Sequence, residues 1–192
     1  MKSRNKIIFT FNSPVVLGFV ALSFLVMLLN IFTGGDSNRF LFMTYRSPLN
    51  SIWTYVRFFT HVLGHSGWEH FIGNMSYILL IGPLLEEKYG PKKIMIVMAV
   101  TALATALINF IFFRNVALCG ASGIVFAFIV FASFTRYRDG EIPITFILVV
   151  LVFLGQQLYD GVFVQDNISN MAHIAGGVIG AIFGFVEVKK RR

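Results

Sequence analysis

The sequence predicts an all-helical membrane protein that crosses the bilayer several times. Of its 192 residues, 56% are hydrophobic and only 13% are charged, and the mean hydropathy is +0.75. A soluble domain carries roughly 25% charged residues, because its surface faces water on all sides. Backbone groups in lipid must pair within the protein, and no barrel-type alternation of apolar and polar residues is visible. The long apolar runs are therefore predicted to be helices.

The rest of the composition excludes other classes of protein. One cysteine, 5 prolines and 22 phenylalanines exclude a disulfide scaffold, a collagen-like repeat and a disordered chain. The net charge is +7, but the cations lie between apolar runs rather than on one basic face with interleaved aromatics. We therefore expect no nucleic-acid partner.

Six apolar runs have the length and the lack of charge expected of spans. They cover roughly residues 14–33, 70–85, 94–113, 121–135, 142–158 and 171–186. The second, fourth and sixth runs are shorter and richer in Gly, Ser, His and Asn. The first run is long for a secretory signal and no small-x-small cleavage site follows it, so we expect it to be a retained span.

The cations predict the orientation of these spans. With the amino terminus inside, twelve of the 16 Lys and Arg residues fall on the cytoplasmic side: Lys2, Arg4, Lys6, Lys88, Lys92, Lys93, Arg136, Arg138, Lys189, Lys190, Arg191 and Arg192. The outer side keeps Arg39, Arg46, Arg57 and Arg114. The positive-inside rule then places both termini in the cytoplasm.

The longest connection, residues 34–69, is predicted to lie outside. Its middle, from Ser51 to Val62, has an uneven amphipathic pattern rich in aromatic residues, which suits a segment in the headgroup zone. No repeat or second domain is evident, so residues 1–192 are predicted to form a single membrane domain.

Polar side chains inside spans are costly and indicate functional sites. His70 and Asn74 are four residues apart and so share one helix face. They are either an interhelical hydrogen-bonding pair or donors in a site. His61 and His65 precede them and raise the possibility of a metal site with His70, but the only carboxylate close by is Glu69, so we expect no metal.

The segment from Cys119 to Gly123 is a turn of small residues that opens the fourth run. Ser122 could simply cap the helix. However, the glycines at positions 120 and 123 leave its hydroxyl open, and the free amides of a helix start can stabilise an oxyanion. Cys119 is a competing nucleophile, although a lone thiol is more often a small apolar filler.

The sixth run carries a stripe of small residues, on which another helix can pack closely. The stripe comprises Ala172, Gly176, Gly180 and Gly184, and His173 lies beside it at the outer end. The fourth run has small residues of its own at Gly123 and Ala127. If the two stripes meet, Ser122 and His173 come together at similar depth, either as nucleophile and base or as a structural hydrogen bond.

These motifs resemble those of the rhomboid intramembrane serine proteases. The resemblance rests on Gly-x-Ser-Gly at residues 120–123, Ala-His-x-x-Gly at 172–176 and His-x-x-x-Asn at 70–74, and it extends from about Arg57 to the end of the sixth run. Further similar positions are His61, His65, Gly82, Glu86 and Gly90. The resemblance implies a six-helix rhomboid-like bundle. It also implies structural roles for Arg57, Gly82, Glu86 and Gly90.

The resemblance also implies roles for the site residues. Ser122 would be the nucleophile and His173 the general base, in a dyad without a carboxylate. The oxyanion hole would be formed by His70, Asn74 and the Ser122 amide. The acids Asp36, Asp160 and Asp166 lie in predicted outer loops with no reason to reach His173, and Asn170 is a candidate to orient it. No cofactor is implied. The expected partners are the bilayer and transmembrane protein substrates.

Two positions depart from the family pattern. Phe126 stands where many members have a tyrosine that packs on the catalytic histidine, and Val56 precedes Arg57 where a tryptophan is frequent. The first change bears on base orientation and the second on how the outer loop sits in the membrane.

Two other function classes are open to the sequence. A non-proteolytic relative would bind transmembrane helices and steer their folding or degradation, but such relatives usually lack the serine or the histidine. A channel or transporter would carry carboxylates near the bilayer midplane, and none is present in the runs. A compact chain of this kind suggests a bacterial inner or plasma membrane.

Overall fold

A computed structural model describes residues 11–134, 144, 147–152, 155 and 167–190 of the chain. Its elements are α1 (Pro14–Phe32), a short π-helical turn η1 (Asn38–Phe42), α2 (Ile52–Thr60), α3 (Trp68–Tyr89), α4 (Pro91–Phe112), α5 (Ser122–Ser133) and α7 (Asn167–Lys189). No strand occurs in this described part, where the only β-type pairing is an isolated bridge between Thr44 and Leu118. The predicted all-helical class is therefore confirmed for these residues.

The predicted spans match these helices to different degrees. Three helices are long and apolar enough to cross a bilayer: Pro14–Phe32, Pro91–Phe112 and the part of α7 from Asn170 to Lys189. α5 is apolar but shorter, and α3 is long but carries the polar residues noted above. Most of the predicted run 142–158 lies outside the described residues, so the count of six stays a prediction.

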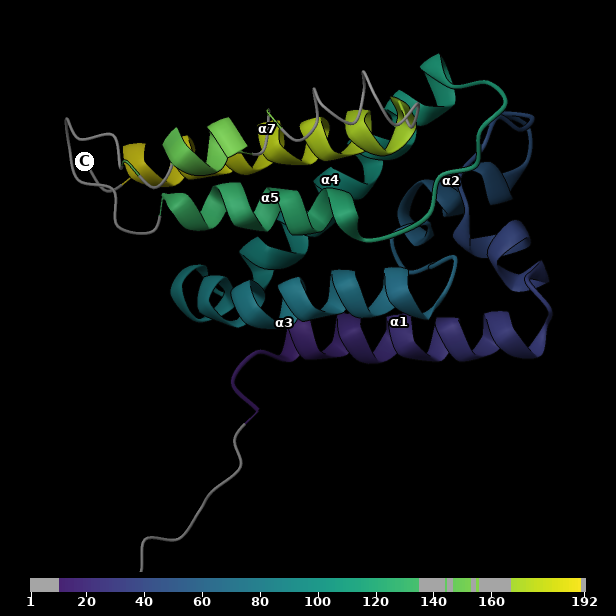
Figure 1. Ribbon diagram of the computed structural model, residues 1–192, viewed down its shortest axis with the longest axis horizontal. Coiled ribbons are helices and arrows are strands. Elements are labelled where there is room, and N and C mark those ends of the chain that lie inside the picture. Colours follow the sequence, from purple (N-terminus) through teal and green to yellow (C-terminus); the bar gives the residue numbers. More distant parts are fainter. Residues whose placement is uncertain (1–10, 135–143, 145–146, 153–154, 156–166, 191–192) are drawn as a thin grey trace, which may run out of the picture.

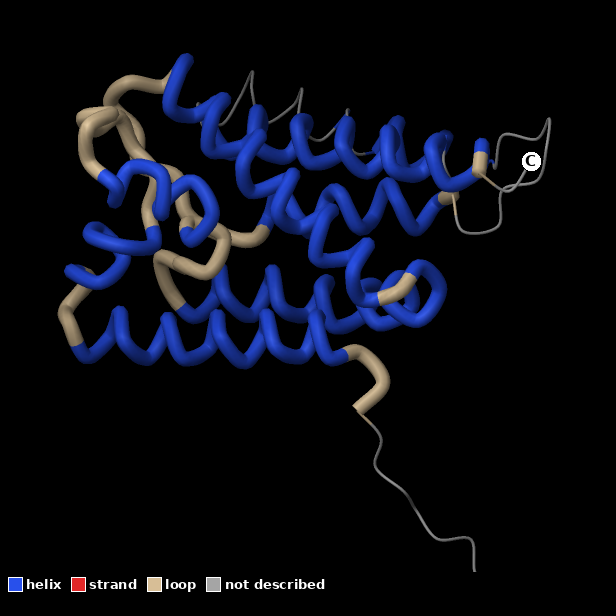
Figure 2. Tube along the Cα trace, turned by 180° about the vertical axis from the view of Figure 1, so that it is seen from behind, coloured by secondary structure: helices blue, strands red, loops and turns tan. Residues whose placement is uncertain are grey.

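The helices pack in two adjoining pairs. α1 lies beside α3, and α5 lies beside α7, while α4 crosses between them (Figure 1; Figure 2). α3 also contacts α5, which joins the two pairs. Their shared core contains the fully buried side chains of Ile78, Ile94, Ile124, Phe128 and Phe131.

The first helix is capped by a side chain from the third. Both carboxyl oxygens of Glu86 accept backbone hydrogen bonds, from Val15 N at 3.0 Å and from Val16 N at 2.9 Å. The first amides of a helix have no partner within the helix and carry its positive dipole end, so an acidic group is stabilising there. Glu86 is only 2% exposed, and it therefore fixes the start of α1 against the end of α3.

The turn between α3 and α4 depends on a glycine. Gly90 has φ +84°, a value that residues with a Cβ rarely adopt, and its amide donates to Glu86 O at 2.8 Å. Pro91 follows as the first residue of α4, where its missing N–H costs nothing. The chain can thus reverse direction with no intervening loop.

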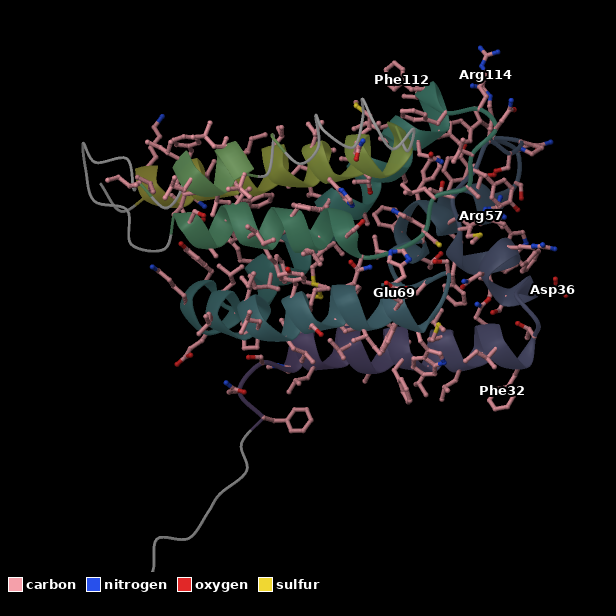
Figure 3. The ribbon with its side chains drawn as sticks, viewed as in Figure 1. Phe32, Asp36, Arg57, Glu69, Phe112 and Arg114 are labelled. Atoms are coloured by element: carbon pink, nitrogen blue, oxygen red, sulfur yellow. The ribbon has the colours of Figure 1, made fainter. Side chains whose placement is uncertain are left out.

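The long connection between α1 and α3 is held by a buried arginine. Arg57 of α2 is 4% exposed, donates to Phe40 O at 3.2 Å and Ser47 Oγ at 2.9 Å, and stacks its guanidinium 4.4 Å from the ring centre of Tyr45. Figure 3 shows Arg57 at the same end of the bundle as Phe32, Asp36 and Arg114. The structural role that the resemblance implied for Arg57 fits these contacts.

Candidate active site

Ser122 is the first residue of α5, and the turn before it is hydrogen-bonded to the connection between α1 and α3. The amide of Gly120 donates to His61 O at 2.9 Å. The residue in the capping position is Ala121, so Ser122 is not the capping residue itself. The first helical bond runs from Val125 N to Ala121 O. The amide of Ser122 precedes this bond and therefore has no hydrogen-bond partner within the helix.

Two polar side chains of α3 converge on this turn. A Cβ built on Gly120 would lie 2.6 Å from His70 Nε2 and 3.6 Å from Asn74 Nδ2. Gly120 also has φ +119°, so the position requires glycine for both its space and its backbone. His70 and Asn74 thus face the turn that leads into Ser122.

The amide of Asn74 is a buried donor. Asn74 is 7% exposed, and its Nδ2 has no hydrogen-bond partner within the described part of the chain. A buried polar group without a partner costs free energy, and such groups are rare unless a ligand or a solvent molecule completes them. Next to Ser122 and the first amides of α5, an unpaired N–H donor suits a developing negative charge.

α7 approaches α5 at backbone distance. A Cβ built on Gly176 would lie 2.0 Å from Gly123 O, and one built on Gly180 would lie 2.2 Å from Ala127 O. Farther along the same stripe, a Cβ on Gly184 would lie 2.3 Å from the ring of Phe134. The small residues at these positions therefore allow the two helices to touch along their length.

This packing brings His173 to the beginning of α5. The ring centre of His173 lies 4.4 Å from that of Phe126, at an interplanar angle of 42°. The carbonyl oxygen of Ala172, the residue before His173, lies 3.4 Å from the Cβ position of Gly123, the residue after Ser122. The immediate neighbours of Ser122 and His173 are thus in contact, and both side chains are half-buried.

The other residues considered for this site are placed as follows. Asn170, one turn before His173, is buried, and its Nδ2 has no hydrogen-bond partner in the described part of the chain. Asp36 is exposed beyond the end of α1 and points away from the bundle in Figure 3. Asp160 and Asp166 lie outside the described residues.

The two histidines upstream of His70, His61 and His65, make hydrogen-bond contacts within the protein. His61 is 1% exposed, with Nδ1 3.2 Å from Arg57 O and Nε2 3.2 Å from Thr105 Oγ1. His65 Nδ1 lies 3.1 Å from Leu63 O. Burial lowers the pKa of both side chains to about 4, so both rings are neutral. Among the described residues no group of His, Cys, Asp and Glu has the geometry to hold a metal ion.

Cys119 is poorly suited to compete as the nucleophile. Burial raises the pKa of its thiol to about 11. The thiolate is the reactive form of cysteine, so the raised pKa disfavours reaction of this thiol at neutral pH.

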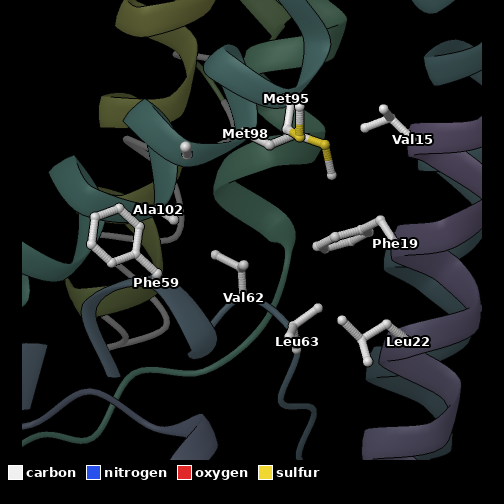
Figure 4. Close-up of a pocket in the computed structure, with 10 residues that line it drawn as sticks. Val15, Phe19, Leu22, Phe59, Val62, Leu63, Met95, Met98 and Ala102 are labelled. Atoms are coloured by element: carbon white, nitrogen blue, oxygen red, sulfur yellow. The ribbon is translucent and has the colours of Figure 1, made fainter. Parts of the chain in front are cut away.

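Two hollows of different character flank these elements. One, of about 400 Å³, is lined by Ser66, Gly67, Glu69 and His70 and opens beside the site. The other, of about 270 Å³, is apolar and lies between α1, α2 and α4, with Phe19, Val62 and Met98 in its walls (Figure 4). Of these two hollows, the first is lined by a polar residue of the site, His70.

Ser66 is a site residue that the sequence motifs did not indicate. Its Oγ lies 3.1 Å from His70 Nδ1. The spacing of four residues is a signal that could have suggested the contact, but Ser66 precedes the helix, which begins at Trp68. Helical spacing alone therefore could not establish it.

Comparison with known proteins shows the family of this chain. The family model described as the Rhomboid domain matches residues 52–190, which include α2, α3, α4, α5 and α7. The chain belongs to the rhomboid family. As a rhomboid family member with long apolar helices, it is an integral membrane protein.

Individual rhomboid relatives match over different shares of their length. The chain is 25% identical to Rhomboid protease GlpG of Haemophilus influenzae over 152 residues, covering 77% of this chain and 76% of the relative. It is 31% identical to RHOMBOID-like protein 4 of Arabidopsis thaliana, covering 64% of this chain and 31% of the relative. It is 30% identical to Rhomboid-related protein 2 of Mus musculus, covering 67% of this chain and 47% of the relative. The chain thus spans less than half of the last two.

Proposed function

We propose that this rhomboid family member is an intramembrane serine protease that cleaves transmembrane proteins near the outer face of the membrane. Ser122 is the nucleophile and His173 the general base. The oxyanion is held by the Ser122 amide, His70 and Asn74. The name of the Haemophilus influenzae relative, a rhomboid protease, supports the same reaction class.

The observation that carries the proposal is the contact of α5 with α7 at Gly123 and Gly176. Gly123 directly follows Ser122, and Gly176 is one turn beyond His173, so backbone contact at this point favours close approach of the hydroxyl and the imidazole. A nucleophile and a base on separate helices need such a contact, because a bulkier residue would hold them apart.

The chemistry follows from these roles. Ser122 Oγ attacks the carbonyl carbon of the scissile peptide bond while His173 accepts the hydroxyl proton. The negative charge on the carbonyl oxygen is stabilised by the three N–H donors. The C–N bond then breaks, His173 gives its proton to the leaving amine, and water hydrolyses the resulting ester by the same steps. The hollow beside His70 supports access of water.

The setting in the membrane restricts the substrate. A transmembrane helix hides its peptide bonds in its own hydrogen bonds, so cleavage requires a stretch near small or helix-weakening residues. The site lies at the end of the bundle that carries the outer connection, which agrees with cleavage at the outer face. We further propose that both termini are cytoplasmic and that the protein resides in a bacterial inner or plasma membrane.

The test is cleavage of a model transmembrane substrate by purified protein in liposomes. We expect Ser122→Ala and His173→Ala to abolish cleavage. Ser133→Ala is the matched control, because Ser133 lies at the far end of the same helix and its Oγ donates to Ile129 O in the preceding turn. Cleavage at the wild-type rate by either site variant would contradict the dyad.

A serine-directed fluorophosphonate distinguishes the protease from a relative that only binds transmembrane helices. A protease is labelled at Ser122, and His173→Ala prevents the labelling, because the imidazole activates the hydroxyl. A binding protein retains its transmembrane partners on purification but is not labelled. That second result would overturn the proposed reaction.

A further inference from the structure

The three described histidines of the outer region differ in what their ring nitrogens contact. The Nδ1 atoms of His61 and His65 each lie against a backbone carbonyl. The Nδ1 of His70 instead lies 3.1 Å from the hydroxyl of Ser66. This difference matters because the tautomer of a neutral imidazole is set by the hydrogen bond that one of its nitrogens makes.

A carbonyl and a hydroxyl have opposite effects on the tautomer. A carbonyl oxygen only accepts, so the contact of His65 Nδ1 with Leu63 O requires the proton on Nδ1 and leaves Nε2 without one. A hydroxyl can donate as well. The Oγ–H of Ser66 can therefore bond to an unprotonated Nδ1 of His70, which places the ring proton on Nε2.

The position of His70 Nε2 explains why the tautomer of this ring matters. His70 Nε2 lies 2.6 Å from the Cβ position of Gly120, in the turn that leads into Ser122. Only a protonated Nε2 can donate a hydrogen bond at this point, and a bare Nε2 would place a lone pair against the developing negative charge. The function proposed for His70 thus requires the tautomer that a donating Ser66 favours.

We propose that Ser66 is a positioning residue that holds His70 as the Nε2–H tautomer, so that this ring donates to the oxyanion. The inference rests on the proposed function of the site. Ser66 does not touch the reacting atoms, and it acts only through the His70 ring. Ser66 is exposed at the hollow of about 400 Å³ that it shares with Gly67, Glu69 and His70.

The exposure of Ser66 limits the size of its effect. When the hydroxyl is removed, water can reach His70 Nδ1 through the hollow, and water donates and accepts with equal ease. Both tautomers are then populated, and a part of the protein keeps the donating form. We therefore expect Ser66→Ala to lower kcat by roughly 3- to 10-fold, less than the 10²–10³ that follows removal of an oxyanion donor, with KM unchanged.

The direct test is nuclear magnetic resonance of the ring nitrogens in protein labelled with ¹⁵N-histidine, above neutral pH. The chain has 4 His, so the spectrum holds four rings, and the one lost in His70→Gln is assigned to His70. We expect Nε2–H in the wild type, a mixture in Ser66→Ala, and Nε2–H again in Ser66→Thr, which restores the hydroxyl. Nδ1–H in the wild type, or an unchanged His70 pattern in Ser66→Ala, would overturn the inference.

The kinetic test uses the model transmembrane substrate in liposomes. Ser66→Ala should lower kcat in the wild-type background but have no further effect in His70→Gln, since its role passes through that ring. A structural role would lower kcat equally in both backgrounds, and that result would overturn the inference. The matched control is Ser76→Ala, an exposed serine of α3 two residues beyond Asn74 and so on the opposite face of the helix.

The two proposals fail in different ways. If the wild type does not cleave, the proposed function fails, while the tautomer of His70 is still decided by the spectrum. If the wild type cleaves through Ser122 and the spectrum or the double variant contradicts the role of Ser66, the inference alone fails.

Discussion

Gly176 of α7 lies against the carbonyl oxygen of Gly123 of α5, so closely that a Cβ on Gly176 would stand 2.0 Å from that oxygen. This is backbone-to-backbone contact, with no flexible side chain to move aside. The register of α7 on α5 is therefore set one residue after Ser122 and three residues after His173. The geometry of the proposed dyad depends on this contact.

Gly176→Ala should accordingly reduce activity strongly. The added methyl group forces the helices apart or out of register, which costs about 1–3 kcal/mol in an already filled interface and moves the imidazole away from the hydroxyl. We expect kcat to fall more than tenfold, as measured with the model transmembrane substrate. Gly18→Ala is the control, because a Cβ at Gly18 of α1 meets no atom within 4 Å. Equal activity of the two variants would contradict the role of the contact.

Phe126→Ala should weaken the action of His173 as the general base while leaving its imidazole in place. The Phe126 ring packs 4.4 Å from the His173 ring, and loss of this wall frees the imidazole to adopt unproductive rotamers. We expect kcat to fall while fluorophosphonate labelling of Ser122 slows in proportion. Phe126→Tyr keeps the ring and should stay near the wild-type rate. If Phe126→Ala matched Phe126→Tyr in both assays, the ring would have no part in orienting His173.

Glu86→Gln should destabilise the fold without touching the site. Glutamine keeps one acceptor oxygen, but its NH₂ group then faces a backbone N–H of α1, leaving buried donors opposed at a cost of about 1–3 kcal/mol. We expect a lower Tm in detergent, measured by intrinsic fluorescence. Glu87→Gln is the control, since Glu87 is exposed on the next position of α3. A Tm unchanged in Glu86→Gln would show that the cap does not support α1.

Stability should fall as the pH is lowered from about 6.5 toward 4. The pKa of His61 is lowered to about 4 by burial, from an ordinary value of 6.5. Between these two values the unfolded chain binds a proton that the folded protein excludes, so protonation favours unfolding, by roughly 3 kcal/mol at the lower end. The loss should be seen as a falling Tm over this range. His61→Gln should be less stable at neutral pH but show a flatter pH dependence, and an equally steep profile in that variant would assign the effect to other groups.

The sequence by itself predicted the elements whose signal is local. Charge-free apolar runs predicted helices at 14–33 and 94–113, and the structure has them at Pro14–Phe32 and Pro91–Phe112. A span in lipid must be apolar along its whole length, so hydropathy alone reveals it. The second predicted span ends at about residue 85, because Glu86, Glu87 and Lys88 interrupt the apolar run, whereas the helix α3 continues to Tyr89. Charge is a local stop signal only where the chain leaves lipid, and Glu86 instead stays buried against α1.

The residues of the candidate site, and the close packing of the two helices that carry Ser122 and His173, were predicted from the sequence. Motifs on three runs indicated Ser122, His173, His70 and Asn74, because serine, histidine and asparagine are expensive in a membrane unless they have a use. Which atoms face one another depends on the packing of helices distant in the sequence. The contact of Gly120 with His70 was decided by tertiary structure alone, since spacing along a chain carries no information on how separate segments are brought together. The small residues at Gly123 and Gly176 indicated that two helices could pack closely, but the atoms that meet there were decided by the packed structure.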